Sequence, residues 1–163
     1  MSTLNDAIVQ SLTVSQKLLN RYCDDLKPEE WLHRPCAGGN AAAWIVGHLI
    51  LTERSALGRV GVTDLPALPE GFEKRFARDE AAAKAPDFGD VTVLLPLFNR
   101  HREMLIEAVR RAGPDVMERP LEKPSPLYGS RVWETINFMG AHVTMHAGQV
   151  TIIRRSMGKP PIV

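Results

Sequence analysis

Residues 131–157 read RVWETINFMGAHVTMHAGQVTIIRRSM and carry the clearest helical pattern in the chain. Apolar residues recur in this stretch at alternating steps of three and four, which places them on one face of an α-helix. That face consists of Val132, Ile136, Met139, Val143, His146, Val150 and Ile153. Ser130 is expected to cap the helix, and the run from Gly158 to Pro161 is expected to end it. The stretch therefore predicts a long helix with one side packed against a core.

Three earlier segments show the same periodicity, and connections rich in proline and glycine separate them. The predicted helices span Leu4 to Asp24, Ala41 to Val60 and Val91 to Ala112. Their expected caps are Thr3 (with Asp6 completing a capping box), Asn40 and Asp90. No segment alternates strongly enough to predict a strand. The expected fold is therefore all-α, with four helices packed as a bundle.

The connection from Gly61 to Gly89 is far longer than a turn between antiparallel helices needs. It contains Pro66, Pro69 and Pro86, and a short helix is expected within it around Phe72–Lys84. A connection of this length could cross the bundle and leave the second and third helices parallel.

Composition suits one domain spanning residues 1–163, with 44% hydrophobic and 24% charged residues. The net charge of +1 indicates no nucleic-acid partner and no anionic membrane. No apolar run is long enough to cross a membrane, and the N-terminus has no basic region of a secretion signal, so the cytoplasm is the expected location. Cys23 and Cys36 are expected to be free thiols.

Five histidines are the candidate functional residues. His142 and His146 are four residues apart on one helix face, the spacing that lets two imidazoles share a metal ion. His48 lies on the face that the second helix is expected to pack in the core, together with Trp44, Leu51, Ser55 and Gly58. Their alternative role is that of ordinary core histidines satisfied by hydrogen bonds. His101 is interpreted as a core or rim histidine, with a fourth ligand or acid–base group as its alternative, and His33 as a solvated loop residue.

Several stretches resemble one known family. Residues 40–49 read NAAAWIVGHL, residues 142–150 read HVTMHAGQV, and residues 31–35 read WLHRP. Joined at this separation, they resemble the DinB-like family of bacterial metal-binding bundles, which includes YfiT-like proteins. The resemblance extends over nearly the whole chain.

The resemblance implies a bundle in up-down-down-up order, in agreement with the long second connection. It also implies one divalent ion held by His48, His142 and His146, and a homodimer. Gln149 matches a motif of the family and could orient a ligand or a bound water, with a packing role equally open. Gly148 is expected to let another helix approach closely.

Three neutral imidazoles leave positions on an ion open for water or substrate. The wider superfamily includes S-transferases and an isomerase that use low-molecular-weight bacterial thiols. The resemblance therefore implies a metal-dependent thiol S-transferase, or a related hydrolase or isomerase, acting on a small molecule. The alternative is a non-catalytic metal-binding stress-response protein. Zinc, nickel, iron and manganese all accept imidazole, so the sequence leaves the metal open.

Overall fold

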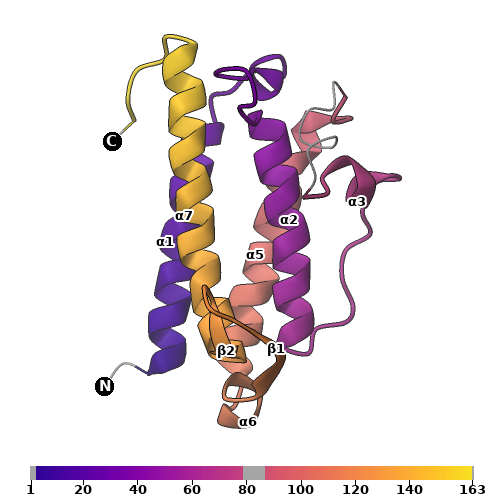
Figure 1. Ribbon diagram of the computed structural model, residues 1–163, viewed down its shortest axis with the longest axis vertical. Coiled ribbons are helices and arrows are strands. Elements are labelled where there is room, and N and C mark those ends of the chain that lie inside the picture. Colours follow the sequence, from indigo (N-terminus) through magenta and orange to yellow (C-terminus); the bar gives the residue numbers. More distant parts are fainter. Residues whose placement is uncertain (1–2, 79–86, 163) are drawn as a thin grey trace.

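A computed structural model describes residues 3–78 and 87–162 of the chain. Its long helices are α1 (Leu4–Cys23), α2 (Ala42–Arg59), α5 (Leu94–Arg111) and α7 (Val132–Ser156). In Figure 1, α1 and α7 run in one direction, while α2 and α5 run in the other. The order along the chain is therefore up-down-down-up, and the expected four-helix bundle is confirmed. No helix in the described residues is long and apolar enough to cross a membrane.

Shorter elements join these helices. They are the 3-10 helices η1 (Glu30–Leu32) and η2 (Val91–Val93), the single turns α3 (Phe72–Arg75) and α6 (Pro114–Met117), and the strands β1 (Pro120–Ser125) and β2 (Gly129–Arg131). The connection after α2 runs back along the outside of that helix and carries α3 (Figure 1). The short helix expected over Phe72–Lys84 is present only as the single turn α3. Residues 76–78 are not helical, and residues 79–84 lie outside the described part of the chain.

The helix starts agree with the sequence patterns in part. At α1, the hydroxyl of Thr3 accepts from the amide of Asp6, and the Asp6 carboxylate accepts from the amide of Thr3, which is the expected capping box. The expectation for Asn40 is wrong, because α2 starts after Ala41 and no side chain caps it. Before α5, Asp90 caps the 3-10 turn η2 and not the α-helix itself.

The expectation that the chain has no strand is also wrong, because β1 and β2 pair as a short antiparallel hairpin ahead of α7. This hairpin moves the helix start. The N-cap of α7 is Arg131 and not Ser130. The carboxylate of Glu134 accepts hydrogen bonds from the backbone amides of both residues. One acidic side chain therefore binds the end of the hairpin to the first turn of α7.

The core has two apolar clusters stacked along the bundle, with a polar layer between them. In that layer, Glu53 and Arg102 form an ion pair of 2.6 Å, and both side chains are fully buried. Arg102 also donates to the carbonyls of Leu12 and Met139 and to the hydroxyl of Ser15. Residues of all four long helices thus meet at one buried guanidinium.

The helices do not pack equally against one another. The most extensive pairs are α1 with α7 and α2 with α5, whereas α2 and α7 share a smaller interface. Gly140 permits the close approach of α7 to α1, because an added Cβ would lie 2.1 Å from Oγ of Ser11. The role expected for Gly148 is not found within the chain, since no described residue lies within 4 Å of the position where its Cβ would stand.

Candidate metal centre

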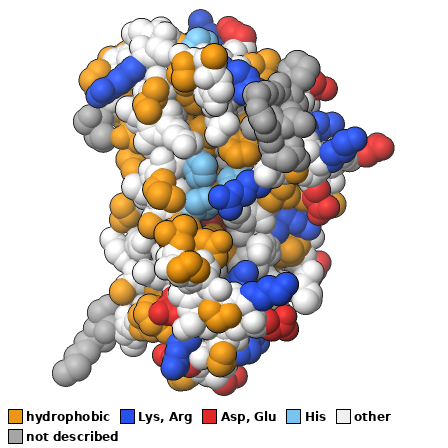
Figure 2. Space-filling view, in the orientation of Figure 1, with side chains coloured by type: hydrophobic (Ala, Val, Ile, Leu, Met, Phe, Trp, Pro, Cys, Tyr) orange, Lys and Arg blue, Asp and Glu red, His pale blue; other side chains and the backbone are white. Residues whose placement is uncertain are grey.

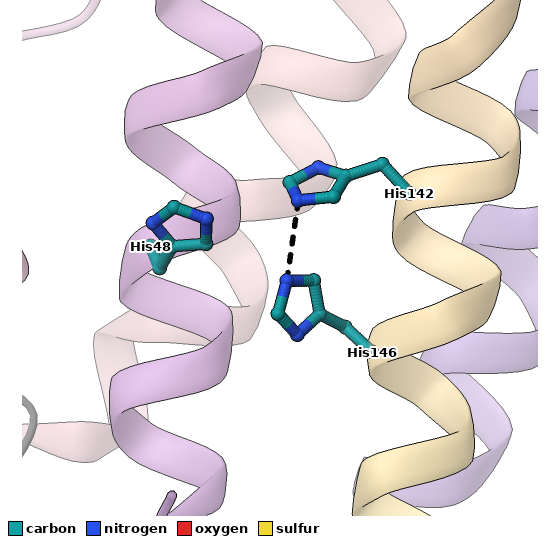
Figure 3. Close-up of side chains that lie close together, drawn as sticks. All are labelled: His48, His142 and His146. Atoms are coloured by element: carbon teal, nitrogen blue, oxygen red, sulfur yellow. Dashed lines mark hydrogen bonds between the residues drawn. The ribbon is translucent and has the colours of Figure 1, made fainter. Parts of the chain in front are cut away.

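The interface between α2 and α7 brings three imidazoles together. His48 projects from the middle of α2, and His142 and His146 project toward it from successive turns of α7 (Figure 3). One ring nitrogen from each lies within 4.8 Å of the other two. The convergence expected from the sequence is therefore found, although the helices that carry these residues are far apart along the chain.

A hydrogen bond fixes how the ring of His146 faces the centre. Nδ1 of His146 donates to the side-chain oxygen of Gln149 over 2.9 Å, which leaves its Nε2 with a lone pair. That Nε2 lies 3.2 Å from Nε2 of His142. Two imidazole nitrogens on one tetrahedral ion lie roughly 3.4 Å apart, given bonds of about 2.1 Å. The pair is therefore spaced as two ligands of one ion would be.

The electrostatics favour neutral rings. Burial, helped by the charges of His146 and Arg78, lowers the pKa of His48 to about 4. Burial and then the neighbouring His146 and His48 lower the pKa of His142 to about 3. Burial also lowers the pKa of His146, against the raising effect of its hydrogen bond to Gln149. All three imidazoles are therefore neutral near pH 7, and the neutral form is the one that ligates metals.

Aromatic side chains support the imidazoles from outside the centre. The indole of Trp44 stacks on His48 with 2° between the ring planes and 5.0 Å between the centroids. Phe138 stacks in a similar way on His142, at 5.7 Å. Gly47 leaves room for the ring of Phe76, because an added Cβ would lie 2.1 Å from it. These contacts restrict ring rotation on both sides of the α2–α7 interface.

A pocket of about 330 Å³ opens beside the histidines and is lined by His48 and His142. Leu51 and Ser55 belong to the face expected to pack in the core, but they line this pocket. The lining also holds the basic residues Arg59 and Arg78 and the aromatic residues Tyr128 and Phe138, which no sequence motif marks as functional. In Figure 2, the histidines reach the surface beside a basic side chain and above a group of hydrophobic ones.

The other two histidines lie elsewhere. His101 is buried, with Nδ1 bonded to the carbonyl of Leu97 at 2.7 Å and Nε2 bonded to Arg54 at 3.1 Å. It is a satisfied core histidine and not a fourth member of the cluster. His33 is half-buried, and its Nε2 lies 2.9 Å from the hydroxyl oxygen of Ser156. It is therefore less exposed to solvent than expected.

The residues present fit a divalent ion. Among the described residues, His48, His142 and His146 form the group of His, Cys, Asp and Glu side chains whose donor atoms could hold one. The donors are neutral nitrogens, which suit zinc, nickel, copper or iron better than calcium or magnesium. Three protein donors leave further positions open, as in catalytic sites.

Comparisons with known proteins agree with this arrangement. A family model described as the DinB superfamily matches residues 11–150. The chain is similar in structure to YfiT from Bacillus subtilis, described as a probable metal-dependent hydrolase with an unusual four-helix bundle topology, with a TM-score of 0.67 and 15% identity. That similarity covers 96% of this chain and 89% of the other, and it shows a shared fold. No curated protein sequence matches the chain.

Proposed function

Because this chain belongs to the DinB superfamily, we propose that it is an enzyme that holds one divalent metal ion with His48, His142 and His146. One observation carries the proposal: three neutral imidazole nitrogens converge beside an open pocket, and two of the three rings line it. A purely structural ion would favour a closed site with four protein ligands. The open pocket therefore favours catalysis over the alternative of a non-catalytic metal-binding protein.

The side chains around the centre have separable roles. A divalent ion in such a site lowers the pKa of a water or thiol that it binds, and so supplies a nucleophile near neutral pH. Gln149 holds the Nε2 lone pair of His146 toward the centre. Trp44 and Phe138 hold the planes of His48 and His142. The pocket next to these rings is where a substrate would be placed.

We propose hydrolysis of a small molecule as the leading reaction, since the similar YfiT is described as a probable metal-dependent hydrolase. Transfer to a low-molecular-weight thiol is a second candidate, and one observation favours it. No aspartate or glutamate is among the described residues that line the pocket, so these residues offer no carboxylate as a general base. A thiol, with an ordinary pKa of about 8.5, needs less help to lose its proton than water does.

Metal analysis of protein purified without a nickel column tests the proposal. We expect close to one equivalent of a divalent ion in the wild type, and loss of both ion and activity in His146→Ala. His33→Ala is the matched control, because His33 lies outside the cluster and should keep both. A screen with activated esters, run with and without an added thiol, separates the two reactions. A protein that binds no zinc, nickel, iron or manganese at micromolar concentrations would refute the site.

We also propose a homodimer, which the exposed face of α7 supports. Met145 and Ile152 are 55% and 59% exposed, and Gly148 lies between them on the same face. Large apolar side chains at this spacing suit a helix-to-helix contact between two copies. Sedimentation that gives a monomer at micromolar concentration would contradict this proposal.

A further inference from the structure

The pocket beside the histidines has a charge of one sign. Arg59 and Arg78 both line it, and no acidic residue is among its described lining residues. Neither guanidinium has an ion-pair partner in residues 3–78 and 87–162. Arg59 is half-buried and Arg78 is exposed, so both guanidinium groups are accessible to a ligand from solvent. Two basic groups that have no counter-ion within the described residues, in a pocket whose described lining holds no acid, leave that pocket suited to an anion.

The rest of the pocket lining is largely apolar and partly aromatic. The ring of Tyr128 lies 5.1 Å from that of Phe138, which in turn stacks on His142 at 5.7 Å. Met139 and Phe76 also belong to the apolar part of the lining. The rings thus form a continuous surface that leads from the hairpin tip to the candidate metal centre. Such a surface binds the apolar body of a ligand by burial and ring stacking.

We propose that the pocket binds a small organic acid with an apolar body about the size of one aromatic ring. The proposal rests on the function proposed above and names the class of its substrate. The carboxylate would bind Arg59 and Arg78, and the body would pack on Tyr128, Phe138 and Met139. The volume of about 330 Å³ is near the lower end for ligand pockets, which favours a single-ring compound over a nucleotide or a peptide.

Three probe compounds test the two halves of this proposal. 4-Phenylbutyrate carries the ring and the carboxylate, and 4-phenylbutyramide carries the same ring without the charge. We expect calorimetry or tryptophan fluorescence to show at least tenfold tighter binding of the acid. Acetate, the charged group without the body, should also bind at least tenfold more weakly. Equal binding of acid and amide, or no binding of the acid, would overturn the proposal.

Variants identify the groups responsible. Arg59→Met and Arg78→Met should each weaken phenylbutyrate binding about tenfold, the effect of losing one charge-assisted hydrogen bond. Arg155→Met is the matched control, because Arg155 is exposed and lies outside the pocket lining, and it should bind as the wild type does. Unchanged binding in both pocket variants, with their circular dichroism also unchanged, would refute the assignment.

The measurement is made on the full chain both after chelation and after loading with zinc, since a carboxylate can also bind a metal directly. A preference for the acid in the chelated protein shows that the arginines recognise it. If the chelated protein prefers the acid but never takes up metal, the pocket assignment stands and the proposed function fails. If the protein takes up one ion but shows no preference for the acid in either form, the pocket assignment fails and the metal site stands.

Discussion

Gln149 is the residue that determines which nitrogen of His146 faces the centre, because its oxygen accepts from Nδ1. In Gln149→Leu this acceptor is lost and the ring can present either nitrogen. We expect the affinity for zinc to fall about 10- to 100-fold, the usual effect of removing the partner that orients a ligand. Competition with a fluorescent chelator measures the change.

Gln149→Glu is the control for this prediction, because a carboxylate oxygen keeps the acceptor. Its zinc affinity should stay within a few-fold of the wild type. Since Gln149 is exposed, neither variant should alter the melting temperature of the metal-free protein. Wild-type affinity in the leucine variant would show that Gln149 has no orienting role.

The lowered pKa values of His48 and His142 predict how acid affects the metal-free protein. A histidine whose pKa is lower in the folded than in the unfolded state binds protons preferentially when unfolded. Its full contribution to the unfolding free energy is therefore present above pH 6.5. That contribution is lost as the pH falls toward about 4 for His48 and about 3 for His142. Urea unfolding of chelated protein between pH 7 and pH 5 measures the loss before most carboxylates titrate.

His142→Gln is the variant for this measurement, because its amide does not titrate. Its unfolding free energy should fall less between pH 7 and pH 5 than that of the wild type. Equal slopes for the two proteins would mean that the buried imidazole does not titrate abnormally.

The sequence predicts the three histidines of the site but not the arginines of the pocket, and the reason is physical. The i, i+4 spacing of His142 and His146 places them on one helix face whatever the rest of the fold, and the family resemblance adds His48. Arg59 and Arg78 come from the end of α2 and from the crossing connection. Spacing along the chain does not indicate that these two segments meet at one pocket.

Gly140 and Gly148 both lie in α7, but replacing each with alanine should change the unfolding free energy in opposite directions. A Cβ at position 140 would lie 2.1 Å from Oγ and 3.3 Å from the carbonyl carbon of Ser11, so α1 and α7 would have to separate. We expect Gly140→Ala to reduce the unfolding free energy by about 1–3 kcal/mol. At position 148 nothing lies within 4 Å, so Gly148→Ala should raise it by up to about 1 kcal/mol through helix propensity. Denaturant unfolding of the two variants checks both signs.

The long helices are predictable from the sequence because each repeats apolar residues over several turns. The hairpin is not, since β1 contains two prolines and two charged residues and shows no alternation between buried and exposed positions. The face predicted for α2 is also partly wrong. Ser55 and Gly58 are exposed, and the buried face instead includes Ile45, Leu49 and Glu53. Because α2 is apolar on nearly all sides, the spacing of its apolar residues does not determine which face is buried.

The polar layer at the middle of the bundle joins all four long helices, and removing only one partner of its ion pair should be costly. Arg102→Met leaves Glu53 buried without its partner, and we expect a loss of about 3–5 kcal/mol in the unfolding free energy. Replacing both residues, as Glu53→Leu with Arg102→Met, should recover most of that loss, because no charge then remains buried. Urea unfolding measures both variants.

Arg111→Met is the matched control for burial. Arg111 and Glu107 pair at the same 2.6 Å, but their side chains are 78% and 46% exposed. The unfolding free energy of Arg111→Met should therefore be lower than that of the wild type by at most about 1 kcal/mol. A single variant Arg102→Met as stable as Arg111→Met would show that the central pair does not hold the four helices together.

The pairing of α1 with α7 has a consequence for how the protein is made. The two helices form one of the most extensive interfaces in the bundle, yet α7 is synthesised well after α1. The ribosome adds about 5–20 residues per second, so the apolar face of α1 waits several seconds for its partner. Contacts between distant segments also slow folding, because a long chain must be closed before they form. The bundle is therefore expected to complete only after α7 leaves the ribosome, and chaperones that shield apolar helices would act on the nascent chain before then.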